Sequence, residues 1–123
     1  MDWTTWIIIG AVIATAFILK RISFVGADTA RSLLKTGALV IDVRSAAEFN
    51  SKHLPGAINI ELGNLSAEIA RVAPDKEKPL LLHCLSGGRS GVARHQLRGL
   101  GYKSVYNLGS YGRAEKIVRG SNI

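Results

Sequence analysis

The residues in this sequence that could do chemistry together are Cys84 and Arg89, a thiol and a guanidinium separated by four residues. An apolar run that starts at Pro79 precedes the thiol, and a periodic segment follows the arginine. This order predicts a buried strand, a tight turn and a helix. A thiol at a helix N-terminus and close to an arginine has its thiolate form favoured. The turn is therefore expected to present a sulfur nucleophile.

The glycines of this turn favour a backbone that binds an anion. Gly87 and Gly88 have no Cβ atom to obstruct a tight turn, so successive N–H groups can point at one centre. The guanidinium adds a planar cation that suits a sulfonate, sulfate or phosphate group. We expect Cys84 to be the catalytic residue. The substrate is expected to be bound by the five residues that follow it, Leu85, Ser86, Gly87, Gly88 and Arg89.

The stretch Cys84–Arg89, with the sequence CLSGGR after a leucine-rich strand, resembles the active-site loop of single-domain rhodaneses, the thiosulfate or persulfide sulfurtransferases. Asp42–Arg44, followed by Glu48 and by His53–Ile60, also resembles the rhodanese pattern, so the resemblance covers Ser23–Tyr111. Related cysteine-dependent phosphatases place five residues between cysteine and arginine. The four found here enclose a smaller pocket, which favours sulfur transfer.

The resemblance implies a mechanism and a class of substrate. The Cys84 thiolate attacks the outer sulfur of thiosulfate or of another sulfane-sulfur donor, and a persulfide forms on the cysteine. Backbone N–H groups of Leu85–Arg89 stabilise the persulfide, and Arg89 steadies the anionic end of the donor. The chain has one cysteine and no second thiol to receive the sulfur. The acceptor is therefore an external thiol, cyanide or a protein, and no cofactor is expected.

Three charged residues, Asp42, Arg44 and Glu48, are expected to support the site. In one interpretation Arg44 pairs with Glu48, or Asp42 caps nearby backbone, and the contact braces the loop. In the other interpretation Arg44 helps to bind the substrate anion. Ser45 and Glu48 also have the spacing of a capping box, which predicts a short helix after the strand that ends at Asp42.

Other functions for the same cysteine stay open. A non-catalytic binding module would use the pocket for recognition alone. A redox or nitrosation sensor would use the same activated thiol. A phosphatase or an arsenate reductase would share the nucleophile, although the loop spacing favours sulfur transfer.

Composition argues against several kinds of site and partner. A single cysteine cannot form an intramolecular disulfide or a zinc site of several cysteines. His53, His83 and His95 lack ligand spacing, so no metal is expected. The net charge of +7 suggests nucleic acid, but the basic residues are spread without interleaved aromatics, and no nucleic-acid partner is expected. We interpret His53 as a hydrogen-bonded turn residue and His83 as a buried strand residue.

Residues 1–22 are predicted to form a transmembrane anchor, and residues 23–123 a rhodanese-like domain. Trp3–Leu19 carries no charged residue. Two tryptophans near its start suit an aromatic belt, and the lysine and arginine that follow suit the positive-inside flank. Membrane contact through residues 3–22 would leave the catalytic domain in the cytoplasm. The alternatives are a cleaved signal peptide, with a secreted or periplasmic domain, and a soluble surface helix.

The order of elements predicts an α/β fold, an open parallel sheet of about five strands with helices on both faces, preceded by one transmembrane helix. The expected strands are Ser23–Val25 at an edge, Ala38–Asp42, Ala57–Ile60, Pro79–His83 and Tyr102–Leu108. The expected helices are Ala27–Lys35, Leu62–Val72, Ser90–Leu100 and Gly112–Arg119. Active loops lie at the carboxyl ends of parallel strands, which is where Cys84 falls.

Overall fold

The computed structural model describes residues 2–120, except for the side chains of residues 20–22. Its helices are α1 (Trp3–Ile22), α2 (Ala27–Lys35), α3 (Ala46–Ser51), α4 (Leu65–Val72), α5 (Gly88–Gly99) and α6 (Tyr111–Gly120), with a 3-10 turn at Leu62–Asn64. Its strands are β1 (Leu39–Asp42), β2 (Ile58–Asn59), β3 (Leu80–His83) and β4 (Val105–Gly109). These strands form one parallel sheet in the order β2-β1-β3-β4.

Alternate side chains of the central strands enter two apolar layers, because successive residues of a strand point to opposite faces. Ile41, Leu80 and Leu82 belong to the layer that α4 and α5 complete. Val40 and Leu81 belong to the layer that α2 and α6 complete. Since helices cover both faces, the central strands are almost continuously apolar. The predicted α/β fold with helices on both faces is confirmed.

The parallel register aligns the carboxyl ends of β1 and β3, where polar residues replace apolar ones. Asp42 lies opposite His83 in this register, and Cys84 follows directly. All three side chains are fully buried. The edge of the sheet that parallel α/β folds use for their sites therefore carries a buried acid, an imidazole and a thiol.

The edge strand predicted over Ser23–Val25 is wrong, because the structure has only a single bridge there. Phe24 bridges Asn107 in parallel orientation, and the Val25 N–H donates to the Asn107 carbonyl at 2.9 Å. The chain then enters α2 at Ala27 and turns away from β4. The described part of the chain therefore has a sheet of four strands, one fewer than expected.

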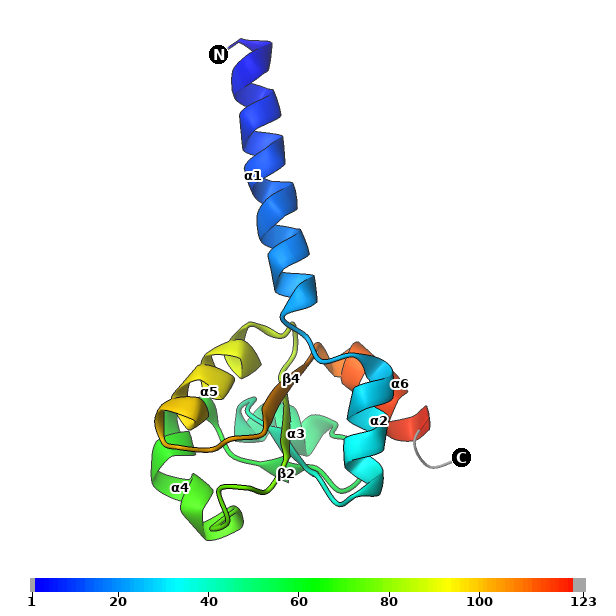
Figure 1. Cartoon of the computed structure of the whole chain (residues 1–123), viewed down its shortest axis with the longest axis vertical. Coiled ribbons are helices and arrows are strands. Elements are labelled where there is room, and N and C mark those ends of the chain that lie inside the picture. The colour runs from blue at the N-terminus through cyan, green and yellow to red at the C-terminus, as the bar shows by residue number, and fades with distance from the viewer. Residues whose placement is uncertain (1, 121–123) are drawn as a thin grey trace.

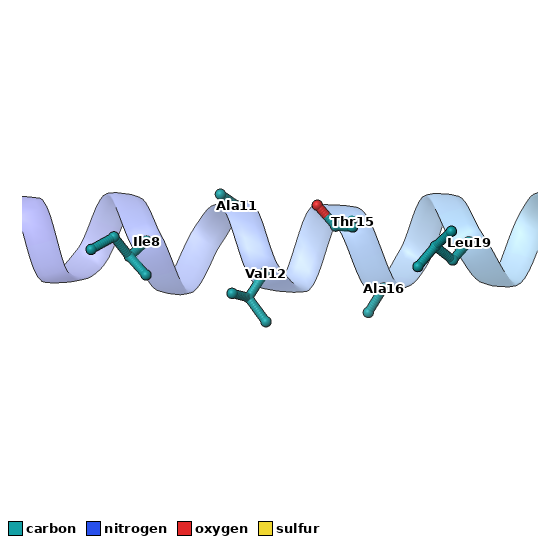
Figure 2. Close-up of a pocket in the computed structure, with 6 residues that line it drawn as sticks. All are labelled: Ile8, Ala11, Val12, Thr15, Ala16 and Leu19. Carbon is teal, nitrogen blue, oxygen red and sulfur yellow. The ribbon is translucent and has the colours of Figure 1, made fainter.

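Helix α1 extends away from the sheet and its covering helices (Figure 1), and its apolar side chains are exposed. Small and apolar side chains run along one of its faces (Figure 2): Ile8, Ala11, Val12, Thr15, Ala16 and Leu19. None of the helices in the described part of the chain is long and apolar enough to cross a membrane. The uncharged stretch Trp3–Leu19 would cover about 25 Å, less than the roughly 30 Å of a hydrocarbon core.

The predicted transmembrane anchor at residues 1–22 and the single-pass membrane location are therefore wrong. The cytoplasmic side predicted for the catalytic domain depended on that anchor, and the membrane contact predicted through residues 3–22 is not supported. The division of the chain into residues 1–22 and 23–123 stays a prediction.

The C-terminal helix α6 begins at Tyr111, one residue before the predicted start. Gly109, at the end of β4, has a φ of 95°, a left-handed conformation that glycine adopts without a Cβ clash. This bend lets the chain leave the sheet and enter α6 directly. The buried residues Tyr111, Ala114 and Ile117 then pack in the apolar layer that contains Ala30 of α2. The start of α6 thereby lies beside the carboxyl end of β3.

Candidate active site

Cys84 lies between β3, which ends at His83, and the first turn of α5 at Gly88. Gly87 precedes this helix with a φ of 98°. A residue with a side chain would be strained there, so the turn depends on glycine. The Gly87 N–H donates to the Cys84 sulfur, with an N to Sγ distance of 3.0 Å.

Hydrogen bonds lower the pKa of the Cys84 thiol. Burial by itself raises the pKa, because it disfavours the charged form. The Ser90 hydroxyl, 3.5 Å from Sγ, and the backbone N–H groups of Ser90, Gly87 and Ser86 outweigh burial. The pKa of Cys84 therefore lies below its ordinary value of 9.0, and the nucleophilic thiolate is favoured.

Ser90 and Asn107 form a buried polar layer behind the sulfur, which the sequence interpretation missed. The Ser90 hydroxyl has one proton, which it donates either to Asn107 Oδ1 at 2.7 Å or, when the thiol is ionised, to the Cys84 sulfur at 3.5 Å. Asn107 Oδ1 also accepts from the Gly109 N–H at 2.9 Å, and Asn107 Nδ2 donates to the Gly87 carbonyl at 3.1 Å. The available signal was an asparagine inside the otherwise apolar run Val105–Leu108. One amide side chain thus fixes three points around the loop.

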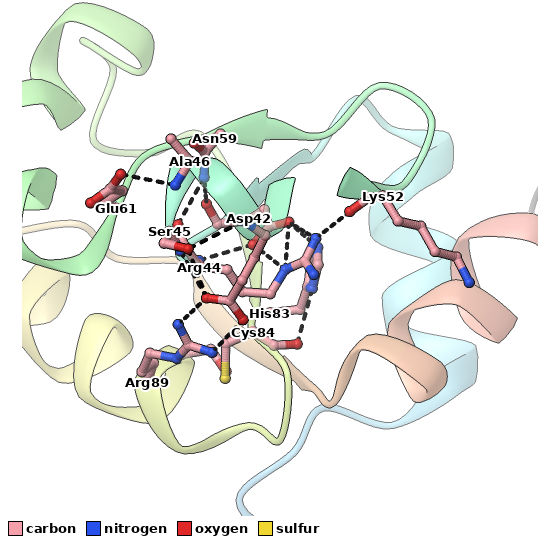
Figure 3. A network of polar contacts seen from close by, with 12 residues as sticks. Asp42, Arg44, Ser45, Ala46, Lys52, Asn59, Glu61, His83, Cys84 and Arg89 are labelled. Carbon is pink, nitrogen blue, oxygen red and sulfur yellow. Dashed lines mark hydrogen bonds and ion pairs between the residues drawn. The ribbon is translucent and has the colours of Figure 1, made fainter. Parts of the chain in front are cut away.

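Arg89 pairs with Glu48 of α3 at the edge of the site (Figure 3). Its Nη1 and Nη2 atoms donate to the two carboxylate oxygens at 2.6 and 3.0 Å. Glu48 also completes the predicted capping box with Ser45, which is confirmed. The Arg89 hydrogen bonds and then the Ser45 N–H hold the pKa of Glu48 at about 2. Glu48 first, and the Cys84 thiolate to a lesser extent, raise the pKa of Arg89.

Arg44 forms a second, buried pair with Asp42 (Figure 3). Its Nε and Nη2 atoms donate to the carboxylate at 3.0 and 2.8 Å. The backbone N–H of Arg44 donates to the same carboxylate at 2.9 Å, and Nη2 also donates to the Lys52 carbonyl at 2.6 Å. The pair with Asp42 raises the pKa of Arg44. Arg44 is thus joined to Asp42 rather than to Glu48, and Asp42 caps the backbone as one interpretation expected.

His83 is fully buried between Cys84 and the Asp42 carboxylate, and so has the buried position that we expected. Its Nε2 atom lies 3.8 Å from Asp42 Oδ2, too far for a hydrogen bond. Burial lowers the pKa of His83 and outweighs the attraction of Asp42. The imidazole is therefore neutral at pH 7, and its ring packs edge to face against Tyr111.

Leu85 and Ser86 form the outer part of the loop. The Leu85 side chain is 59% exposed, while its carbonyl accepts from the Tyr111 N–H at 3.1 Å. Ser86 forms an antiparallel bridge with Ser110. The start of α6 therefore holds the outer part of the loop, and the apolar Leu85 side chain stays exposed at its rim. Among the described residues no cluster of three or more histidine, cysteine or acidic side chains could hold a metal.

The structure brings Cys84 together with the predicted loop residues, and Glu48 joins them through Arg89. Asp42 and Arg44 form a separate, buried pair. A model of the rhodanese-like domain matches residues 26–112, which is more than two thirds of the chain. This chain belongs to the rhodanese-like domain family. The sequence resemblance is thereby confirmed.

Two thiosulfate sulfurtransferases are similar in sequence to this chain. Thiosulfate sulfurtransferase PspE of Escherichia coli is 39% identical over 69 residues, which are 56% of this chain and 66% of the relative. Thiosulfate sulfurtransferase GlpE of Pseudomonas savastanoi is 33% identical over 81 residues, which are 66% of this chain and 74% of the relative. The chain thus spans about two thirds of the first relative's length. The predicted enzyme class, a rhodanese-type sulfurtransferase, is confirmed by these matches.

Solved structures show the same rhodanese fold. The human single-domain sulfurtransferase TSTD1 superposes with a TM-score of 0.65 at 30% identity, covering 76% of this chain and 96% of that protein. A structure described as a rhodanese with anions from E. coli gives a TM-score of 0.61 at 35% identity, covering 63% of this chain and 91% of that protein.

Proposed function

We propose that this rhodanese-like protein transfers a sulfane sulfur from thiosulfate or a persulfide donor to an external acceptor through a persulfide on Cys84. The observation that carries the proposal is the hydrogen bonding of Cys84 Sγ. The sulfur receives the Gly87 N–H at 3.0 Å and faces the Ser90 hydroxyl at 3.5 Å. These contacts lower the pKa of the thiol despite its burial, so a nucleophile is available without a general base.

The proposed first half-reaction conserves charge and needs no proton. The Cys84 thiolate attacks the outer sulfur of thiosulfate and forms a new sulfur–sulfur bond. The bond from that outer sulfur to the sulfonate sulfur breaks, and sulfite leaves with the electron pair. A persulfide anion remains on the cysteine, where N–H groups already directed at the sulfur stabilise the negative charge.

The charged rim supports an anionic donor. The Arg89 side chain is 38% exposed and is held by Glu48 through one bidentate pair. A guanidinium in this position can exchange a carboxylate for the sulfonate of thiosulfate, which offers similar oxygen acceptors. One structural relative at 35% identity is described as a rhodanese with anions. We therefore place the anionic end of the donor at Arg89.

The second half-reaction requires an external acceptor. The chain has one cysteine, so no second thiol can take the sulfur within the molecule. Cys84 is fully buried, and the neighbouring Leu85 side chain is exposed at the rim. Thiosulfate and a small acceptor such as a thiol or cyanide have to pass the residues that cover the sulfur, and an acceptor protein would first contact the apolar Leu85. The first half-reaction is common to all of these acceptors.

Mass spectrometry of the intact protein tests the proposal before the acceptor is known. Incubation with thiosulfate should add the mass of one sulfur atom, and a reducing thiol should remove it. The Cys84→Ser protein, which changes only the reacting atom, should show no gain. An unchanged mass in folded wild-type protein would contradict the proposal and favour a binding or redox-sensing role. Equal gain in Cys84→Ser would show that the sulfur is carried elsewhere.

A further inference from the structure

The segment that joins α1 to the domain, Ser23–Val25, lies against β4 beside the catalytic loop. Phe24 bridges Asn107, and the Val25 N–H donates to the Asn107 carbonyl at 2.9 Å. Asn107 is also the residue whose side chain holds the Gly87 carbonyl and the Ser90 hydroxyl. The connecting segment therefore contacts the same residue that fixes the loop around Cys84.

The Phe24 ring occupies the space left by two glycines of the site. A Cβ atom built on Gly87 would lie 2.7 Å from Cζ of this ring, and one built on Gly109 would lie 2.9 Å from Cδ2. Real Cβ atoms do not approach other atoms so closely. Both glycines have left-handed φ angles, 98° and 95°. One aromatic ring thus packs directly on the two residues where the backbone bends around the thiol.

Arg113 of α6 holds the connecting segment in this place. Its Nη1 atom donates to the Leu108 carbonyl at 2.6 Å, and its Nη2 atom donates to the Val25 carbonyl. The guanidinium carbon lies 5.4 Å from the centre of the Phe24 ring, which is within the range of a cation–π contact. The ring is therefore fixed between a cation of α6 and the backbone of the catalytic loop.

From this packing we propose that Phe24 is a positioning residue for Cys84, acting through Gly87. The Gly87 N–H is the donor 3.0 Å from the sulfur, and the Phe24 ring lies against the Cα atom of the same residue. Without the ring, Gly87 can leave its left-handed conformation, because glycine has no Cβ atom and adopts other φ angles as readily. The hydrogen bond to the thiolate then lengthens, and the thiol ionises at higher pH.

The proposal rests on the proposed function only in taking Cys84 as the reacting residue. Its test measures the ionisation of the thiol, which does not require sulfur transfer. A protein that gains no sulfur from thiosulfate would contradict the proposed function and leave the role of Phe24 open to the same measurement.

The test is the pH profile of Cys84 alkylation by iodoacetamide in the full chain, for wild type, Phe24→Ala and Phe24→Leu. Each rate is divided by its own plateau at high pH, so that a change in access to the sulfur cancels. With Phe24→Ala the pH midpoint of alkylation should rise by about one pH unit, the effect of one lost hydrogen bond to a charged atom. Phe24→Leu, which keeps part of the packing, should lie between the two.

Tyr106→Ala is the matched control. Tyr106 is an aromatic residue of β4 next to Asn107, but it packs in the layer formed with α2 and α6. This variant should lower the melting temperature and leave the pH midpoint of alkylation unchanged. A folded Phe24→Ala protein with the wild-type midpoint would overturn the proposal. So would an equal shift in Tyr106→Ala. If Phe24→Ala does not fold, Phe24→Leu with the wild-type midpoint overturns it and a raised midpoint supports it.

Discussion

Two arginine–carboxylate pairs lie at the carboxyl edge of the sheet, and they differ in burial. Arg44 and Asp42 have side chains 6% and 0% exposed. Arg89 and Glu48 have side chains 38% and 31% exposed. Both arginines bond their carboxylate through two nitrogen atoms. The same chemistry therefore occurs once inside the fold and once at its surface.

The difference in burial separates a supporting role from a binding role. Arg44 also donates to the Lys52 carbonyl and lies 4.8 Å from the Tyr111 ring centre, so the partners of this guanidinium belong to the fold itself. Arg89 has Glu48 as its hydrogen-bond partner and faces solvent. An incoming anion can replace an exposed carboxylate at small cost, whereas separating a buried pair leaves an uncompensated charge. We therefore favour bracing for Arg44 and substrate binding for Arg89.

The largest expected effect is the loss of stability in Arg44→Ala. This change leaves the Asp42 carboxylate buried without its partner, which should lower the free energy of unfolding by about 3–5 kcal/mol. Urea denaturation of the purified protein measures the change. A loss below about 1 kcal/mol, together with abolished sulfur transfer, would instead assign Arg44 to the substrate anion and remove the distinction between the two pairs.

Arg89→Ala should show the opposite pattern. The rate of persulfide formation with thiosulfate should fall about 100-fold, as for the loss of one preorganised donor to a developing charge. Stability should change by less than about 1 kcal/mol, because exposed pairs contribute little. Stopped-flow detection of sulfite release and urea denaturation measure the two quantities. Arg98→Ala, an exposed arginine on the same helix, is the matched control and should change neither. Equal losses in both variants would indicate a general charge effect.

Glu48→Gln tests the exposed pair by removing the charge of its carboxylate. The amide keeps an oxygen for the Ser45 contacts but removes the charge that Arg89 neutralises. The KM for thiosulfate should fall about threefold, because a freed guanidinium attracts a dianion more strongly. The stability loss should be about 1 kcal/mol, compared with several for Asp42→Asn at the buried pair. Steady-state kinetics and urea denaturation test both statements, and an increase in KM would contradict the exchange of partners.

Local spacing explains what could be predicted from the sequence. The turn at Cys84 follows from an apolar strand, two glycines and a helix that are adjacent in the chain. The capping box of Ser45 and Glu48 likewise depends on residues three positions apart. Continuous apolar runs predicted buried parallel strands, since helices cover both faces. These features required no knowledge of distant contacts.

The features that were missed depend on residues far apart in the chain. Glu48 pairs with Arg89, which lies 41 positions away in the chain. From the sequence, the nearby Arg44 was an equally possible partner for the Glu48 carboxylate. Asn107 reaches Gly87 across 20 positions. The segment Ser23–Val25 was expected to form an edge strand, but the Phe24 ring packs on two glycines, and only one bridge forms there. Charge and hydropathy patterns do not encode which distant residue fills such a space.

The smallest expected effect is a pH dependence of stability at the exposed pair. The folded pKa of Glu48 is about 2, below its ordinary value of 4.5, so the folded state binds fewer protons than the unfolded state between these values. The stabilisation is fully present above pH 4.5 and is lost as the pH falls through about 2. Because the pair is half-exposed, the stability difference between wild type and Glu48→Gln should shrink by no more than about 1 kcal/mol over this range. Urea denaturation at several pH values measures that difference. A constant difference down to pH 2 would mean that Glu48 is not ion-paired in solution, and Arg89 would then be permanently free to bind an anion.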